Sequence, residues 1–133
     1  MKKGGKMIYI LGLVLICVIM GGFGQIYMKK GLKSIGGLEL SEILSKKLIS
    51  TFLERNVFIG FVLYVLASIL WLVVLSKAEV SYVYPLIALG YVVTALLAKF
   101  YFPLIGMQSE NITYIRWFGI LLILGGVFLV TRS

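Results

Sequence analysis

Four long stretches of the chain are mostly apolar and contain no charged residue. They are residues 7–28, 56–76, 80–98 and 117–131. A helix needs about 20 mostly apolar residues to cross about 30 Å of hydrocarbon. Three stretches are long enough alone, and the fourth becomes so when residues 112–114 join it and Arg116 extends its charge to the interface. The pattern therefore predicts four transmembrane helices, near residues 7–28, 57–76, 81–102 and 112–131.

A different pattern fills the segment between the first two predicted spans. Residues 39–55 place apolar side chains at helical spacing on one face. The charged residues of the opposite face are Glu42, Lys46, Lys47 and Glu54. This pattern is typical of an amphipathic helix lying on the membrane surface, and Gly36 and Gly37 break the chain before it. We interpret it as an anchoring linker, with a lateral gate or a contact for lipid headgroups as the alternative role.

Composition agrees with a membrane protein. Hydrophobic residues fill 61% of the 133 positions, which is more apolar surface than a soluble domain of this length can bury. We therefore predict an all-α protein of the inner (cytoplasmic) membrane, with a single membrane domain over residues 1–133. A net charge of +8 is compatible with nucleic-acid binding, but Lys and Arg cluster at the ends of the spans. Membrane lipid is therefore the expected partner, and nucleic acid is not.

The chain has few residues that carry covalent chemistry. It has no His, and its one Cys lies in the middle of the first predicted span. A Cys/His zinc site and a Ser-His-Asp triad are therefore excluded, and we expect no enzyme activity, metal or cofactor. All five acidic residues lie outside the middle of the spans, whereas proton-coupled carriers usually use a buried carboxylate. Glu79, at the start of the third span, is the remaining candidate for a coupling group.

The distribution of positive charge constrains the orientation only weakly. One side of the membrane holds Lys2, Lys3, Lys6, Lys77 and Arg132, which is five. The other side holds Lys29, Lys30, Lys33, Lys46, Lys47, Arg55, Lys99 and Arg116, which is eight. So small a bias allows insertion in both directions. Because four short helices enclose little space, we expect a dimer: an antiparallel or parallel homodimer, or a heterodimer with a paralogue.

The third predicted span contains the most informative polar pattern. Pro85 cannot donate to the carbonyl of Ser81, so the helix should kink or loosen where Tyr82 and Tyr84 lie. A plain packing kink is the alternative to a wet, substrate-facing opening. Further along, small residues recur every four positions as a stripe for close helix contact, within one chain or between two. These residues are Gly90, Thr94 and Ala98.

The other spans carry small and aromatic residues on single faces. In the first span, Gly21, Gly24 and Gln25 share a face, so the glycines make room for packing beside a polar side chain. In the second span, Tyr64 and Trp71 share a face, as packing residues or as part of a cavity wall. The fourth span has its glycines on one face for helix packing or a dimer contact. They are Gly119 and Gly126.

Several of these features occur together in a known family. A Gly-Gln-x-x-x-Lys element ends the first span, and the later spans hold Trp71, Tyr84-Pro85, Trp117 and Gly125-Gly126 in that order. Over residues 10–31 and 64–131 the chain resembles the drug/metabolite transporter superfamily in its four-helix form. Two branches of that superfamily are relevant. They are the small multidrug resistance transporters and the EamA-like small subunits of the undecaprenyl-phosphate-aminoarabinose flippase.

Named positions separate the two branches. The small multidrug transporters carry an essential glutamate in the first span, and Gly21 stands at that position here. They also carry a tryptophan after the tyrosine of the third span, where this chain has Ile87. The flippase subunits instead have Gly-Gln and Tyr-Pro, matched by Gly24-Gln25 and Tyr84-Pro85. The resemblance therefore implies a transporter of a polyprenyl-phosphate-linked sugar or a similar amphipathic lipid.

The resemblance also suggests roles for individual residues. Gln25, Ser81 and Tyr84 would supply uncharged polar groups for the headgroup, while Lys29 and Lys30 would supply cations for the phosphate. Anchoring the end of the first span is the simpler role for both lysines. Two further functions stay open. One is export of small cations or metabolites coupled through Glu79, and the other is a non-transporting partner of a glycosyltransferase.

Overall fold

Four long helices dominate the computed structural model, which describes the backbone of residues 2–133 and the side chains from Gly5 onward. The helices long and apolar enough to cross a membrane are Gly5–Ser34, Arg55–Lys77, Val80–Phe100 and Tyr114–Arg132. The described residues contain no strand, so the prediction of an all-α protein with four membrane-spanning helices is confirmed. The side chains of Lys2 and Lys3, which entered the charge count, lie outside the described part.

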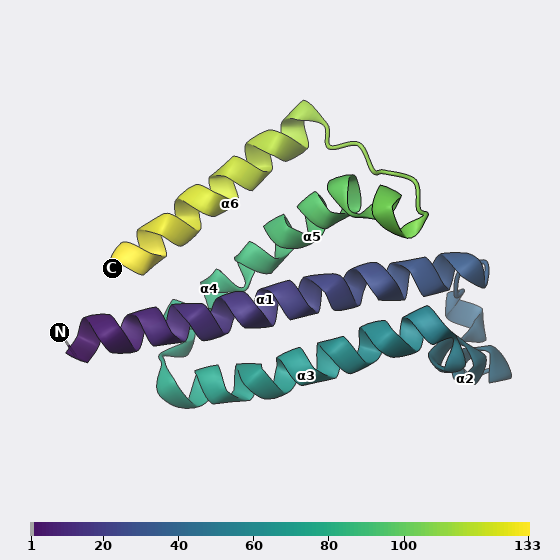
Figure 1. Cartoon of the computed structure of the whole chain (residues 1–133), viewed down its shortest axis with the longest axis horizontal. Helices are drawn as coiled ribbons and strands as arrows, with labels where there is room; N and C mark the ends of the chain where they lie inside the picture. The colour runs from purple at the N-terminus through teal and green to yellow at the C-terminus, as the bar shows by residue number, and fades with distance from the viewer. Residues whose placement is uncertain (1) are drawn as a thin grey trace.

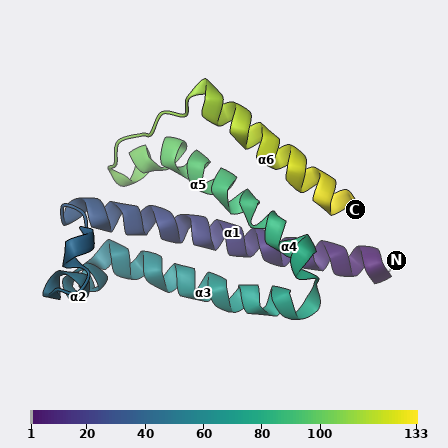
Figure 2. The same ribbon diagram turned by 180° about the vertical axis from the view of Figure 1, so that it is seen from behind.

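The helices form an antiparallel bundle in which α1 has the central place. Helix α1 (Lys2–Ser34) lies between α3 (Arg55–Lys77) and α5 (Ala88–Phe100), as Figures 1 and 2 show. Helix α6 (Tyr114–Arg132) runs outside α5, and the two chain ends lie at the same end of the bundle (Figure 1). The loop between α5 and α6 lies at the other end, together with the segment between α1 and α3.

Glycines set the distance between α1 and α3. A methyl group added to Gly24 would lie 2.8 Å from the carbonyl oxygen of Gly60 and 3.3 Å from the backbone nitrogen of Tyr64. One added to Gly60 would lie 2.7 Å from the backbone nitrogen of Met28. Seven residues after Gly24, Gly31 is equally close to the backbone of Val57. The two helices therefore touch backbone to backbone, which is possible only where side chains are absent.

The first helix extends further than the charge pattern predicted. It continues to Ser34, past the end expected near residue 28. It ends where Gly36 and Gly37 adopt φ angles of 81° and 88°, a left-handed conformation that favours glycine. The last turns thus carry lysines, including Lys33, where positive charge suits the carboxyl end of a helix.

The third span is divided near Pro85. Helix α4 (Val80–Leu86) ends at Leu86, and α5 begins at Ala88 after Ile87, which caps both helices. Because proline has no N–H, the carbonyl of Ser81 loses its usual helical donor. The backbone N–H of Ile87 donates to the Tyr84 carbonyl three residues earlier, at 3.0 Å, which tightens the turn locally. The division lies where the sequence predicted loosening.

The segment between α1 and α3 forms two short helices where we predicted one. They are the 3-10 helix η1 (Leu40–Glu42) and α2 (Lys46–Leu53). Ser45 interrupts the helix, because its hydroxyl donates to the Glu42 carbonyl at 2.6 Å and accepts from the N–H of Lys47 at 3.2 Å. The Lys47 ammonium, 3.0 Å from the Glu42 carboxylate, lowers the pKa of that carboxyl.

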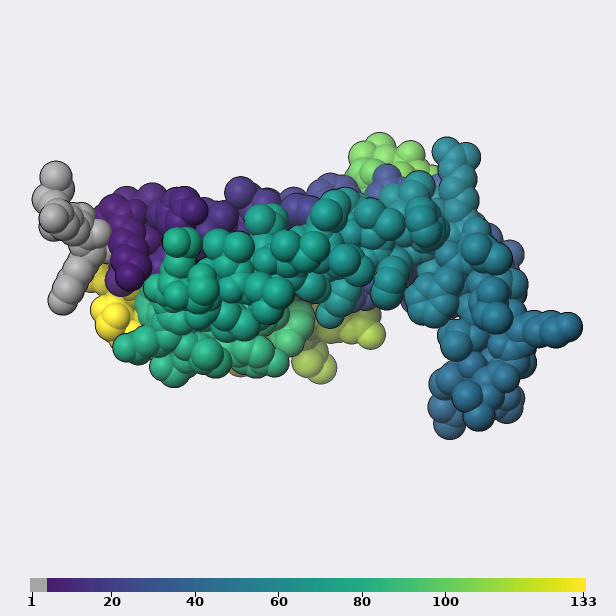
Figure 3. All heavy atoms as spheres, turned by 90° about the horizontal axis from the view of Figure 1, so that it is seen from below, coloured from purple at the N-terminus to yellow at the C-terminus, as the bar shows by residue number. Residues whose placement is uncertain are grey.

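This two-helix segment projects from one end of the bundle (Figure 3). Its apolar side chains stay largely exposed, Leu44 completely. Phe52 packs edge-on against Phe61 of α3, with ring centroids 5.2 Å apart. Because α3 begins at Arg55, directly after α2, the exposed apolar side chains lie at the end of a membrane span.

The small residues of α5 pack within the chain. Gly90 lies against Val18 of α1, with 3.4 Å between an added methyl group and the Val18 Cβ. Thr94 approaches Gly22 in the same way, and Ala98 is buried in a cluster with Ile26 and Phe102. Of the two alternatives for this stripe, the structure therefore shows contact with α1 of the same chain.

Helix α6 packs much less tightly than the others. Val127 is its buried residue, in the main hydrophobic cluster with Val14, Val74 and Leu86. A methyl group added to Gly119 or Gly126 would meet nothing within 4 Å. The same holds for Gly21 of α1. Among the described residues, none of these three glycines makes a close helix contact.

The glycine contact between α1 and α3 gives a testable prediction. Gly24→Ala and Gly60→Ala should each lower the free energy of unfolding in detergent by about 1–3 kcal/mol, because the added methyl group meets backbone atoms. Gly12→Ala, in α1 like Gly24 but in open space, should not lower it and should raise it by at most about 1 kcal/mol, because alanine favours the helix. Thermal unfolding followed by circular dichroism measures both, and equal effects at Gly12 and Gly60 would contradict the close contact.

Candidate functional site

The polar residues predicted in the third span lie on α4. Ser81 and Tyr84 have exposed side chains, and Tyr82 is half-buried. The Tyr82 side chain packs at the edge of the main hydrophobic cluster, and its buried hydroxyl has no hydrogen-bond partner among the described residues. Trp71 of α3 packs against the same cluster. Tyr84 is 62% exposed, so it faces the surroundings of this chain instead of its interior.

Gln25 and Tyr84 are not brought together. Gln25 is exposed on α1, directly after the Gly24 contact with α3. Helix α4 instead packs near Val14, which shares a cluster with Val83. Eleven residues separate Val14 from Gln25, or about 16 Å along the helix axis. Tyr64, which is also exposed, lies at the level of Gln25 because its backbone approaches Gly24.

The two lysines predicted to bind phosphate have different surroundings. The Lys29 ammonium lies 3.8 Å from the carboxylate of Glu110, in the loop between α5 and α6. Both side chains are about half exposed or more, so this ion pair contributes little to stability. Lys30 instead lines a cleft between α1 and α3. Neighbouring residues on a helix point about 100° apart, which accounts for the separation.

This cleft, which we call the basic cleft, has a volume of about 580 Å³. Its lining residues are Tyr27 and Lys30 from α1, Arg55, Asn56, Ile59 and Leu63 from α3, and Ile105 from the 3-10 helix η2 (Phe102–Ile105). The carboxyl end of α1 and the amino end of α3 meet here because the two helices are antiparallel neighbours. Lys30 and Arg55 therefore come to one place although they are 25 residues apart in sequence.

The basic cleft is positively charged. None of its lining residues is acidic. Glu54 lies next to Arg55, but its carboxylate caps α3 by accepting from the N–H of Val57 at 2.8 Å and from the Asn56 amide at 3.3 Å. Within the part of the chain that the structure describes, neither Lys30 nor Arg55 forms an ion pair.

Tyr27, which lines the basic cleft, is paired with Tyr101 outside it. The hydroxyls of Tyr27 and Tyr101 lie 2.8 Å apart and share a hydrogen bond. The Tyr101 ring also packs edge-on against Phe23, with 5.1 Å between ring centroids. These contacts hold the end of α5 against α1 and fix the side chain of Tyr27, which lines the cleft.

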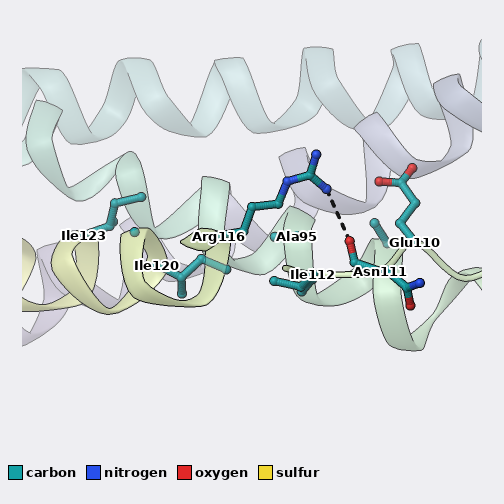
Figure 4. Close-up of a pocket in the computed structure, with 9 residues that line it drawn as sticks. Ala95, Glu110, Asn111, Ile112, Arg116, Ile120 and Ile123 are labelled. Atoms are coloured by element: carbon teal, nitrogen blue, oxygen red, sulfur yellow. Dashed lines mark hydrogen bonds between the residues drawn. The ribbon is translucent and has the colours of Figure 1, made fainter. Parts of the chain in front are cut away.

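A second, smaller cleft lies between α5 and α6. Its volume is about 290 Å³, and Ala95, Gly119, Ile120 and Ile123 form its apolar part. At its other end the Arg116 guanidinium donates to the carbonyl of Asn111 at 3.2 Å, and Glu110 lies close by (Figure 4). Both clefts have their charged groups at the end of the bundle opposite the chain ends.

The acidic residues stay outside the spans in the structure. Glu79 precedes α4, is exposed, and makes no side-chain capping bond. The described residues contain no group of three or more His, Cys, Asp or Glu side chains able to hold a metal ion. The walls between the helices are therefore apolar or uncharged over the middle of the bundle, and the charges lie at its ends.

Sequence reasoning found one of the four polar residues of the basic cleft, namely Lys30. It missed Tyr27 and Asn56, and it counted Arg55 only as a charge that orients the chain. The sequence does contain a signal for the cleft. One cation lies at the end of the first span and another at the start of the second, and these two spans are antiparallel neighbours. Antiparallel packing brings such positions together, but the sequence does not say which lysine points toward the partner helix.

The chain is similar to curated proteins of Pseudomonas fluorescens. The probable 4-amino-4-deoxy-L-arabinose-phosphoundecaprenol flippase subunit ArnE of strain Pf0-1 is 32% identical over 125 residues, covering 92% of this chain and 97% of the relative. The protein of the same name in strain Pf-5 is 39% identical over 67 residues, covering 50% of this chain and 54% of the relative. Neither a protein-family model nor a solved structure matches the chain.

The position of the clefts predicts a labelling pattern. In a Cys17→Ala background, Asn56→Cys and Asn111→Cys should react with a membrane-impermeant maleimide from the same side of the membrane. Ser76→Cys is exposed at the other end of α3. From the side that labels positions 56 and 111, it should react only in the molecules in which those two positions do not react. Labelling of intact and permeabilised cells measures the fractions, and different fractions at positions 56 and 111 would contradict the arrangement.

Proposed function

The chain belongs to the family of flippase subunits named ArnE, and from this membership we propose that it is one subunit of a lipid-linked sugar flippase. It is a multi-pass protein of the inner membrane with four membrane-spanning helices. The proposed substrate is a polyprenyl phosphate that carries a sugar, as the name of the relatives states for those proteins. The observation that carries the proposal is the match over nearly the full length of both chains.

The character of the helix surfaces supports this substrate. A flippase must let a polar headgroup cross while the prenyl tail stays in lipid, so its path needs polar groups that are mostly uncharged. Gln25, Ser81 and Tyr84 supply an amide and hydroxyls on exposed helix faces. Because Gln25 and Tyr84 lie at different depths, we infer that the headgroup contacts them in succession and not in one pocket. Tyr64, exposed at the level of Gln25, would add a hydroxyl, whereas the buried Tyr82 hydroxyl would not.

A second subunit would complete the path. Helix α6 leaves most of its surface uncovered in this chain, and its glycines make no close contact. We propose that Gly119 and Gly126 contact another subunit, either a second copy or a paralogue, because small residues allow close approach of membrane helices. The relatives are themselves named as subunits, which supports an assembly.

The alternatives have less support. The relatives are named as flippase subunits, a class of transporter, and we infer that this chain catalyses no covalent reaction. Export of cations would need a buried coupling group, whereas Glu79 is exposed at the start of α4 and forms no ion pair among the described residues. A role as a passive partner of a glycosyltransferase would leave the uncharged polar groups on the helix surfaces without a function.

The headgroup path can be tested by substitution. Gln25→Ala and Tyr84→Phe should each slow translocation of a fluorescent polyprenyl-phosphate sugar in reconstituted vesicles about tenfold, because a hydrogen bond to the crossing headgroup is lost. Gln108→Ala and Tyr91→Phe are matched controls at exposed positions outside the path and should leave the rate unchanged. Normal translocation in the first pair of variants, at equal expression, would refute the path.

A growth assay separates the flippase from a cation exporter. Glu79→Gln removes the one carboxylate at the start of the third span and should leave lipid translocation within about twofold of the wild type. Cells that express the protein should gain no resistance to toxic quaternary cations. Resistance that depends on Glu79 would instead establish a proton-coupled exporter and overturn the proposed function.

A further inference from the structure

The basic cleft changes from polar to apolar along its length. On α3, Asn56, Ile59 and Leu63 lie at spacings of three and seven residues and therefore share one face. From Asn56 to Leu63 this wall extends about 10 Å toward the middle of the span. On α1, Tyr27 and Lys30 are three residues apart and face the same space. The cleft thus has a charged mouth at the end of the bundle and an aliphatic wall inside it.

The two cations at the mouth lack a neutralising partner. Lys30 and Arg55 form no ion pair among the described residues, and the nearby Glu54 carboxylate is engaged by the backbone of α3 and by Asn56. By contrast, Lys29, the neighbour of Lys30, has Glu110 as its counter-ion. Two unpaired cations at one opening create a positive local potential, so a site of this kind favours an anion.

Two uncharged groups add hydrogen-bond donors. Tyr27 and Tyr101 share one hydrogen bond, which uses only one of their two hydroxyl protons. When Tyr101 donates, the Tyr27 proton is available to an acceptor in the cleft. The Asn56 amide gives one N–H to Glu54 and keeps a second. Cations and neutral donors around one space match the several acceptor oxygens of a phosphate group.

We propose that the basic cleft binds the phosphate of an amphipathic lipid. The phosphate lies between Lys30 and Arg55 and accepts hydrogen bonds from Tyr27 and Asn56. The first part of the hydrocarbon tail lies along the aliphatic wall. Ile59, Leu63 and Ile105 form that wall. This assignment rests on the proposed function for its substrate, a polyprenyl phosphate, and it places the lipid at a site separate from Gln25.

Gln25 and the cleft belong to different faces of α1. Gln25 and Tyr27 are two residues apart, so their side chains point about 160° apart around the helix. A headgroup path along Gln25 and a phosphate site at Tyr27 and Lys30 are therefore separable by substitution. A variant that loses one of these functions is expected to keep the other.

Lipid binding to the full chain tests the proposal directly. Native mass spectrometry of the purified protein in mild detergent measures its apparent Kd for undecaprenyl phosphate. The double variant Lys30→Gln/Arg55→Gln should bind about tenfold more weakly or worse, because two charge-assisted contacts are lost. The matched control Lys33→Gln/Lys46→Gln removes the same charge from exposed positions outside the cleft and should stay within about twofold.

Other lipids separate the sources of the phosphate. Undecaprenol, which lacks phosphate, should bind equally to all variants. If phosphatidylglycerol also loses affinity in the double variant, the cleft accepts phosphate lipids in general, and the proposed chemistry holds. If only undecaprenyl phosphate loses affinity, the cleft selects the polyprenyl lipid, which supports the assignment in its stricter form. Equal losses in the double variant and the control, or none in either, would overturn the proposal.

The result stays distinguishable from a failure of the proposed function. The assay measures lipid binding and needs no translocation. A chain without flippase activity would therefore still show the loss of affinity in the double variant. If the double variant binds the lipid with wild-type affinity and still translocates it, the proposed phosphate site is refuted while the proposed flippase function stands. The single variant Arg55→Gln, at an exposed side chain, should bind severalfold more weakly and serves if the double variant fails to fold.

Discussion

The contact between the backbones of α1 and α3 is the constraint on which the rest of the bundle depends. At Gly24 and Gly60 neither helix has a side chain, so the helices approach until backbone atoms touch. Lipid tails are as apolar as leucine, and helix association in a membrane therefore relies on such close packing more than on the hydrophobic effect. The contact aligns the end of α1 with the start of α3, and this alignment brings Lys30 to Arg55.

The chain separates its charged and uncharged polar groups by depth. Cations and acids lie at the ends of the helices, and the polar side chains within the spans are amides and hydroxyls such as Gln25 and Tyr84. A carboxylate at mid-membrane would favour a cationic substrate, and the described spans hold none there. The arrangement instead suits a substrate that brings its own negative charge and a neutral or hydrogen-bonding sugar.

The four spans could be predicted from the sequence because long uncharged runs have few alternatives in a membrane. The local breaks in helices and the directions of individual side chains could not be predicted, as two positions illustrate. Ser45 stops a helix through two local hydrogen bonds that compete with an otherwise continuous amphipathic pattern. Lys29 and Lys30 look equivalent in sequence, yet one pairs with Glu110 and the other lines the cleft, because a helix rotates about 100° per residue.

The position of α2 has a consequence for how a lipid would reach the cleft. Because α2 ends where α3 begins, insertion of its exposed apolar side chains into the membrane surface would hold Arg55 at the level of the lipid headgroups. A lipid diffusing within its own leaflet would then meet the mouth of the proposed site without lifting its tail out of the hydrocarbon. The search for the proposed site would be two-dimensional, so the rate of capture would depend on the surface density of the lipid.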